Sequence, residues 1–127
     1  YDDTNDDLKV AHCSNTNCST SATITTLDST GNVGKYTSVT IGADGLGLIS
    51  YYDDTNDDLK VAHCSNTNCS TSATITTLDS TGNVGKYTSV TIGADGLGLI
   101  SYRDHTNLDL KVAHCSNAFC APYFRRR

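Results

Sequence analysis

The sequence predicts an all-β fold built from four-stranded antiparallel units in tandem. The first observation is an internal repeat: residues 1–51 and 52–102 are identical at every position, and a third, altered copy begins at Arg103. A period of this length is typical of stacked structural units. The second observation is the composition, because a chain rich in Thr and Gly that has no Glu or Met disfavours helices. The third is the alternation of polar and β-branched residues within each repeat.

Each repeat contains signals for four strands joined by turns. The strands are predicted over residues 36–42, 46–53, 59–65 and 72–80. Asp44 and Gly45 lie between the first two strands and favour a hairpin, because both residues tolerate positive φ. The second strand carries apolar residues on both faces, which predicts that it is covered on both sides. A polar turn at Asp53–Asp58 leads into the third strand. We therefore expect consecutive strands to pair in antiparallel fashion.

Four short antiparallel strands per repeat of about 50 residues describe a β-propeller blade. The run YTSVTIGADGLGLISYYDDTNDDLKVAHC, residues 36–64, resembles the blades of BNR-like, or sialidase-type, β-propellers of bacterial extracellular repeat proteins. The shared features are an Asp-Gly turn, a strand ending in S-Y-x-D, a polar turn and the segment L-K-V-A. The resemblance covers nearly the whole chain and implies a propeller fold. It does not imply sialidase activity, because the Asp-box, the arginine cluster and the Glu of sialidases are missing.

The phase of the repeat divides the chain into about two and a half blades. Residues 1–35 are expected to form half a blade with its third and fourth strands, and residues 36–86 a complete blade. Residues 87–127 form a C-terminal blade in which PYFRRR replaces the fourth strand. Because two and a half blades cannot close a ring and open sheet edges invite pairing, we expect further blades of a longer chain or self-association.

Charge is unevenly distributed along the chain. Residues 1–102 carry twelve Asp against four Lys, a net charge of −8, whereas residues 103–127 carry five basic residues against two Asp, a net charge of +3. An acidic body argues against nucleic-acid binding, and no apolar run is long enough for a membrane span. Tyr123 and Phe124 of the basic tail are expected to pack against a neighbouring blade or chain, and Arg125, Arg126 and Arg127 to lie near Asp-rich turns such as Asp53–Asp58; the alternative is a solvated chain end.

The six cysteines form three pairs of equal spacing. They are Cys13 with Cys18, Cys64 with Cys69, and Cys115 with Cys120. In the strand before the first pair, His12 and Cys13 point to opposite faces, which argues against a shared metal. The spacing predicts three local disulfides, with a metal site or reactive thiols as the alternatives. Disulfides indicate an oxidising location, extracellular or at the cell surface. His12 and its equivalents His63 and His114 are expected to be core or inter-blade residues with hydrogen-bond partners.

Other side chains suggest ligands more weakly. Asp2, Asp7, Asp53 and Asp58 are weak calcium candidates in the polar turns, where they also serve to form the turn. Tyr51, Tyr52 and Tyr102 could stack on sugars or fill the β interior. Asn17 and Asn68 lie in N-x-S sequences that could carry glycans and that mark surface loops.

The sequence favours a secreted, non-enzymatic β-propeller repeat protein with a structural or surface-assembly role, such as a filament or cell-surface component. No catalytic constellation is recognisable, and no cofactor is expected. The main alternative is a carbohydrate-binding, lectin-like propeller. A third possibility is an enzyme whose catalytic residues lie in blades outside this sequence.

Overall fold

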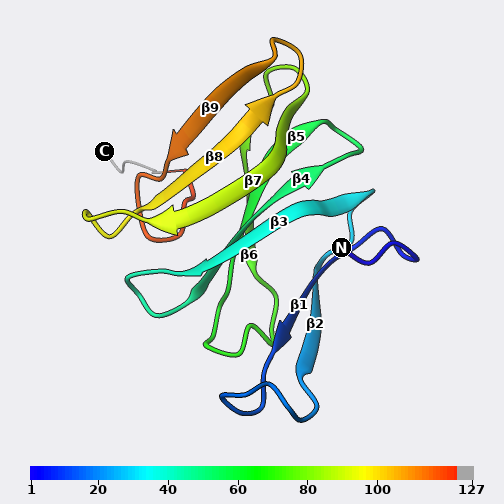
Figure 1. Cartoon of the computed structure of the whole chain (residues 1–127), viewed down its shortest axis with the longest axis vertical. Helices are drawn as coiled ribbons and strands as arrows, with labels where there is room; N and C mark the ends of the chain where they lie inside the picture. The colour runs from blue at the N-terminus through cyan, green and yellow to red at the C-terminus, as the bar shows by residue number, and fades with distance from the viewer. Residues whose placement is uncertain (123–127) are drawn as a thin grey trace, which may run out of the picture.

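The computed structural model describes residues 1–122, which form an all-β molecule without helices (Figure 1). The strands of this part of the chain are β1 (Leu8–His12), β2 (Thr23–Asp28), β3 (Val33–Ile41), β4 (Gly47–Asp53), β5 (Asp58–His63), β6 (Thr74–Asp79), β7 (Val84–Ile92), β8 (Gly98–Asp104) and β9 (Asp109–His114). They form three sheets, ordered β1-β2, β3-β4-β5-β6 and β7-β8-β9. Every pairing joins consecutive strands in antiparallel fashion, so the predicted pairing is confirmed.

β3 starts three residues before the predicted strand, which began at residue 36. β3 begins at Val33, whose backbone N–H donates to the Asp6 carbonyl oxygen at 3.0 Å and whose side chain is fully buried. Gly34 follows with a φ of +103°, and a Cβ at this position would lie 2.7 Å from the Leu8 Cα atom. The glycine therefore permits a close approach of two backbones within the fold, although in the sequence it suggests a loop.

Two apolar clusters lie between the three sheets. Leu8, Leu27 and Val33 pack with Ile49 between the first and second sheets. Leu48, Leu59, Val61, Val84, Val90 and Ile100 pack between the second and third sheets. Neighbouring residues of β4 belong to different clusters, because successive side chains of a strand point to opposite faces. The second sheet is thus covered on both faces, as the apolar pattern of β4 predicts.

The three sheets pack against one another through their faces, and the four-stranded sheet lies between the other two (Figure 1). The chain leaves the second sheet at β6 and returns to β7, which packs against β3 and β4. The first strands of the second and third sheets are therefore neighbours, although 51 residues separate their starts. This arrangement makes the contact between repeats the main structural feature of the molecule.

Candidate functional site

A short disulfide loop follows β1, β5 and β9, which are the third strands of their repeats. The structure joins Cys13 to Cys18, Cys64 to Cys69, and Cys115 to Cys120, which is the pairing that the spacing predicts. The Cys64 backbone N–H donates to the Gly47 carbonyl oxygen at 2.9 Å, so the loop closes against the start of β4. All six cysteines lie in the described residues, and their disulfides leave no thiolate for metal binding or catalysis.

Removal of the central disulfide should destabilise the fold measurably. The double variant Cys64→Ser with Cys69→Ser is expected to lower the free energy of unfolding by about 2 kcal/mol, because a short crosslink restricts the unfolded chain. Urea denaturation under non-reducing conditions measures the loss, and peptide mapping of the parent protein should find Cys64 linked to Cys69. Equal stability of the two proteins would contradict the structural role of this loop.

The three equivalent histidines have different surroundings. His63 is buried, its Nε2 lies 2.8 Å from Asp44 Oδ2, and the edge of Phe119 contacts its ring at a centroid distance of 4.7 Å. His114 makes the same contact with Asp95 at 2.6 Å but is exposed, and His12 is also exposed. The prediction of a core or inter-blade position is therefore wrong for His12 and His114. His63 differs because Phe119 of the following repeat covers it.

In the acidic turn between β4 and β5, both carboxylate oxygens of Asp53 are bound by donors of the protein itself. Asp53 is fully buried, and its Oδ1 atom accepts the backbone N–H groups of Thr55 and Asn56 at 3.0 and 3.1 Å. Its Oδ2 atom accepts the Asn56 side-chain amide at 2.9 Å and lies 3.3 Å from Lys60 Nζ. Burial raises the pKa of Asp58, which lies opposite Asp53 in the β4–β5 pairing. Lys60 therefore supplies the positive charge that a calcium ion would otherwise bring.

The calcium candidates of the first turn are arranged in a similar way. Asp2 accepts the Asn5 side-chain amide at 2.9 Å and forms an ion pair with Lys9 at 2.9 Å. Asp7 pairs with Asp2 through backbone hydrogen bonds. Within residues 1–122, no group of three or more His, Cys, Asp or Glu side chains is placed to hold a metal ion.

A polar network joins each sheet to the next and is more deeply buried between the first and second sheets than between the second and third. Asp28, at the end of β2, accepts the Tyr51 hydroxyl at 2.7 Å and lies 3.6 Å from Lys60 Nζ. Lys60 also contacts Asp53, so one ammonium group lies between carboxylates of the first and second sheets. Tyr102, Asp79, Lys111 and Asp104 repeat this network between the second and third sheets. Sequence reasoning missed it, because only the tertiary fold brings Asp28 to β4 and β5.

The network shifts the pKa values of its members in opposite directions. Burial and the hydrogen bond to Asp28 raise the pKa of Tyr51, and burial with the bond to Asp79 raises that of Tyr102. Burial would also raise the pKa of Asp53, but the hydrogen bonds from Asn56 and the charge of Lys60 outweigh it and lower the pKa. The network is therefore most stable with neutral phenols and ionised carboxylates.

Alkaline titration should detect the buried phenols. Below pH 10.0, the ordinary tyrosine pKa, Tyr51 is neutral in both folded and unfolded chains. Above it the unfolded chain releases a proton that the folded protein retains, so stability falls as the pH rises. Absorbance titration should therefore show Tyr51 and Tyr102 ionising only on unfolding. Tyr51→Phe should lose less stability than the parent between about pH 9 and pH 11. Ionisation of every tyrosine before unfolding would contradict this interpretation.

A second polar contact links the turns of successive repeats. The Tyr52 hydroxyl lies 2.6 Å from Asp57 Oδ1 and 2.9 Å from Asn83 Oδ1, and Tyr1, Asp6 and Asn32 form the equivalent set. The third copy has Arg103 at the position of Tyr52 and Leu108 at that of Asp57. The third copy therefore cannot form this hydroxyl–carboxylate contact.

The tyrosines proposed as sugar-stacking residues are buried. Tyr51, Tyr52 and Tyr102 lie in the interior, so the alternative interpretation as β-interior residues describes their positions. Tyr36 and Tyr87 are instead exposed, with their ring centroids 4.4 Å apart. Both residues have a φ of 55° and lie where the register of the strand pairing shifts. Their side chains therefore do not follow the alternation between the two faces of the sheet that a regular strand shows.

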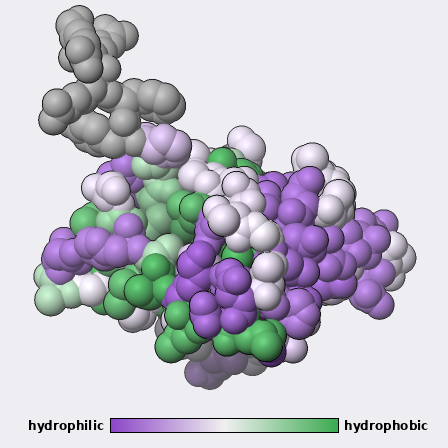
Figure 2. Space-filling view, turned by 90° about the horizontal axis from the view of Figure 1, so that it is seen from above, coloured by the Kyte–Doolittle hydropathy of each residue, from purple (hydrophilic) through white to green (hydrophobic). Residues whose placement is uncertain are grey.

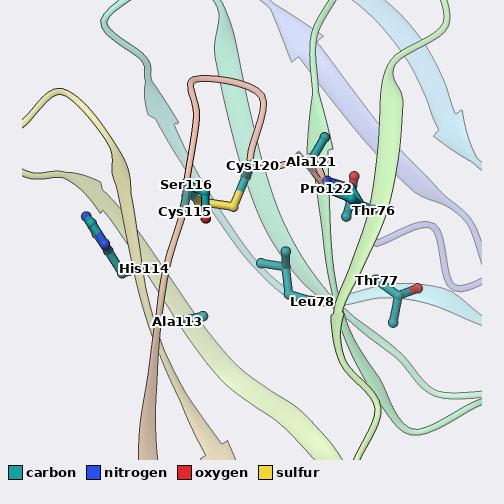
Figure 3. A pocket seen from close by; sticks show the side chains of 10 residues that line it. All are labelled: Thr76, Thr77, Leu78, Ala113, His114, Cys115, Ser116, Cys120, Ala121 and Pro122. Atoms are coloured by element: carbon teal, nitrogen blue, oxygen red, sulfur yellow. A yellow bond between two sulfur atoms is a disulfide. The ribbon is translucent and has the colours of Figure 1, made fainter. Parts of the chain in front are cut away.

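A pocket of about 310 Å³ lies between β6 and β9 (Figure 3). Leu78 of β6 forms one side, and Ala113, His114 and the disulfide of Cys115 form the other. The His114 ring points away from Leu78 and the disulfide (Figure 3), and its Nε2 contacts Asp95 instead. This set contains no nucleophile paired with a base, and the pocket offers binding volume without a catalytic arrangement.

The remaining candidates lie on the surface or outside the described residues. Asn17 and Asn68 are exposed in the disulfide loops. The proposed assembly tail, Tyr123 to Arg127, lies outside the described residues. No helix in residues 1–122 has the length and apolar character needed to cross a membrane.

None of three comparisons, with protein-family models, with curated proteins and with solved structures, gives a match.

Proposed function

We propose that this chain is a non-enzymatic repeat module of propeller-type blades with a structural role in assembly outside the cell, as part of a filament or a surface layer. Consecutive antiparallel strands, the return from β6 to β7 and the packing of β7 against β3 support the blade arrangement. The three disulfides are compatible with an oxidising compartment.

The observation that carries this proposal is the use of the polar side chains. Tyr51, Asp28, Lys60 and Asp53 contact one another across two sheets, and their equivalents do so across the next pair. In residues 1–122, no buried side-chain nitrogen or oxygen atom is without a hydrogen-bond partner. These tyrosine, aspartate and lysine side chains therefore hold neighbouring repeats together, as expected of a protein with a structural role.

The experiment is a measurement of assembly with the full chain. Sedimentation and light scattering across protein concentration should show mass increasing above that of the 13.5 kDa chain, and electron microscopy should show particles of regular spacing. A chain that stays monomeric at all concentrations would overturn the proposal.

Carbohydrate binding is the second candidate, favoured by the exposed Tyr36 and Tyr87 rings, whose centroids lie 4.4 Å apart. Exposed aromatic rings can stack on sugars. A glycan array tests it: reproducible binding that Tyr87→Ala abolishes would favour this function, whereas an array without reproducible signal would contradict it.

A further inference from the structure

The third sheet exposes a face that is buried in the second sheet. Leu59 and Val61 are 0% exposed, whereas their equivalents Leu110 and Val112 are 84% and 60% exposed. Figure 2 views the molecule from above the third sheet of Figure 1 and shows hydrophobic surface among hydrophilic residues. Identical side chains thus form an interface in one sheet and an open surface in the next.

In the second sheet, strand β7 covers this face. Val90 is buried there, its N–H donates to Ser38 Oγ at 3.1 Å, and the Ser50 hydroxyl lies 2.9 Å from that of Thr88. The covering element is therefore a strand of sequence YTSVTI whose Thr and Val side chains face the sheet.

The chain carries an uncovered copy of this element in β3. Val39 and Ile41, the equivalents of Val90 and Ile92, are 61% and 63% exposed. A hollow of about 350 Å³ lies between β1 and β3 and is lined by Val10, Val39 and Ile49 among others. In the second sheet, the interface at β7 joins a sheet face to a covering strand. One molecule thus exposes an unused copy of each surface: the open face of the third sheet and the uncovered strand β3.

The N-terminal hairpin of β1 and β2 determines how β3 of one copy can reach the open face of the third sheet of another copy. β1 pairs with β2 in a two-stranded sheet, a unit that is marginal alone. By the repeat, β1 is a third strand like β5 and β9, and residues 7–12 and 109–114 share the sequence DLKVAH. If β3 of a second copy covered the third sheet as β7 covers the second, its β1 would lie at the place of β9.

From this coincidence we infer that two copies join head to tail by strand exchange. β7 and β8 of one copy lie against β1 and β3 of the second copy, over the hollow between these two strands. There β1 replaces β9 at the edge of β8, β2 adds the fourth strand, and β3 covers the open face. The inference rests on the proposed assembly function and gives the joint that would produce it. Because each joint uses two different surfaces, the product is a ring or a filament.

The exchange conserves the pairing and adds burial. The residues that β1 presents to β8 are those of β9, so Tyr102 would face Lys9 instead of Lys111. The contact of Phe119 with His63 is lost when β9 leaves. In return Val39 and Leu99, which are exposed in the single molecule, become buried as their equivalents Val90 and Leu48 are, and Ile41 becomes partly buried as Ile92 is.

A pair of crosslinking variants tests the exchange in the full chain. Ser101 lies opposite Val112 in the β8–β9 pairing, and the repeat places Val10 at the Val112 position. Ser101→Cys with Val10→Cys should therefore give a ladder of disulfide-linked chains on a non-reducing gel, with positions 10 and 101 joined in peptide maps. The control, Ser101→Cys with Val112→Cys, should lock β9 in place and reduce the assembled fraction at least tenfold.

Two surface variants separate this joint from other arrangements. Val39→Asp should block assembly, whereas Leu110→Asp should leave it intact, because Leu110 leaves the joint with β9. Both residues are exposed in the single molecule, so circular dichroism should show both variants folded. Assembly of the locked variant, or its loss in Leu110→Asp, would overturn the exchange and leave the proposed function standing. A parent chain that never assembles would instead overturn the proposed function.

Discussion

Leu59→Ala is expected to lower the free energy of unfolding by about 2–5 kcal/mol, the range for removing a fully buried leucine side chain. Leu59 lies in the cluster between the second and third sheets together with Leu48, Val61 and Val84. The substitution removes apolar contacts and leaves a cavity that the paired strands cannot fill without distorting their register. Urea denaturation followed by circular dichroism measures the loss.

The same substitution at Leu110 is a matched control. Leu110 has the same neighbours in sequence as Leu59, and both lie in third strands. Because Leu110 is exposed, Leu110→Ala should change the free energy of unfolding by no more than about 0.5 kcal/mol. The comparison should be made at a protein concentration where the chain is monomeric. Equal losses in the two variants would show that Leu110 is buried in solution and would contradict the open face of the third sheet.

Lys60→Met is expected to cost about 3–5 kcal/mol, because it leaves Asp28 and Asp53 buried without their shared cation. Methionine keeps the apolar stem, so the loss reports the charge and not the packing. The contribution of Asp53 depends on pH in a defined direction. Its folded pKa lies below the ordinary value of 3.8, so the contribution is complete above that pH and is lost as the pH falls through the folded pKa. The difference between parent and variant should therefore shrink in acid.

Lys111→Met provides the corresponding control between the second and third sheets. The Lys60 side chain is 13% exposed, whereas that of Lys111 is 37% exposed. Water screens the outer network more strongly, so Lys111→Met should cost about 1 kcal/mol. A larger loss for Lys111→Met than for Lys60→Met would show that burial does not govern the strength of this network.

Local features of the sequence were sufficient to predict most of the secondary structure. The Asp44–Gly45 turn and the alternation that follows it lie within a few residues of each other, so they predict the β3–β4 hairpin without knowledge of the rest of the fold. The equal spacing of the cysteines likewise predicts the disulfide loops. The start of β3 was missed because Gly34 serves a backbone approach to Leu8, a residue distant in sequence.

Local sequence predicted that β4 is covered on both faces, but it could not show which copy of a repeated residue is buried. Leu59 and Leu110, like His63 and His114, have the same residues on both sides and adopt the same strand conformation, yet one of each pair is buried and the other exposed. The joining of Asp28 to Tyr51 and Lys60 likewise depends on how the first sheet sits against the second. The sequence by itself determined the strands, their pairing and the disulfide loops, because turns and alternation act over a few residues. The tertiary structure alone decided which copies of a side chain form an interface, because burial depends on the sheet that packs against it.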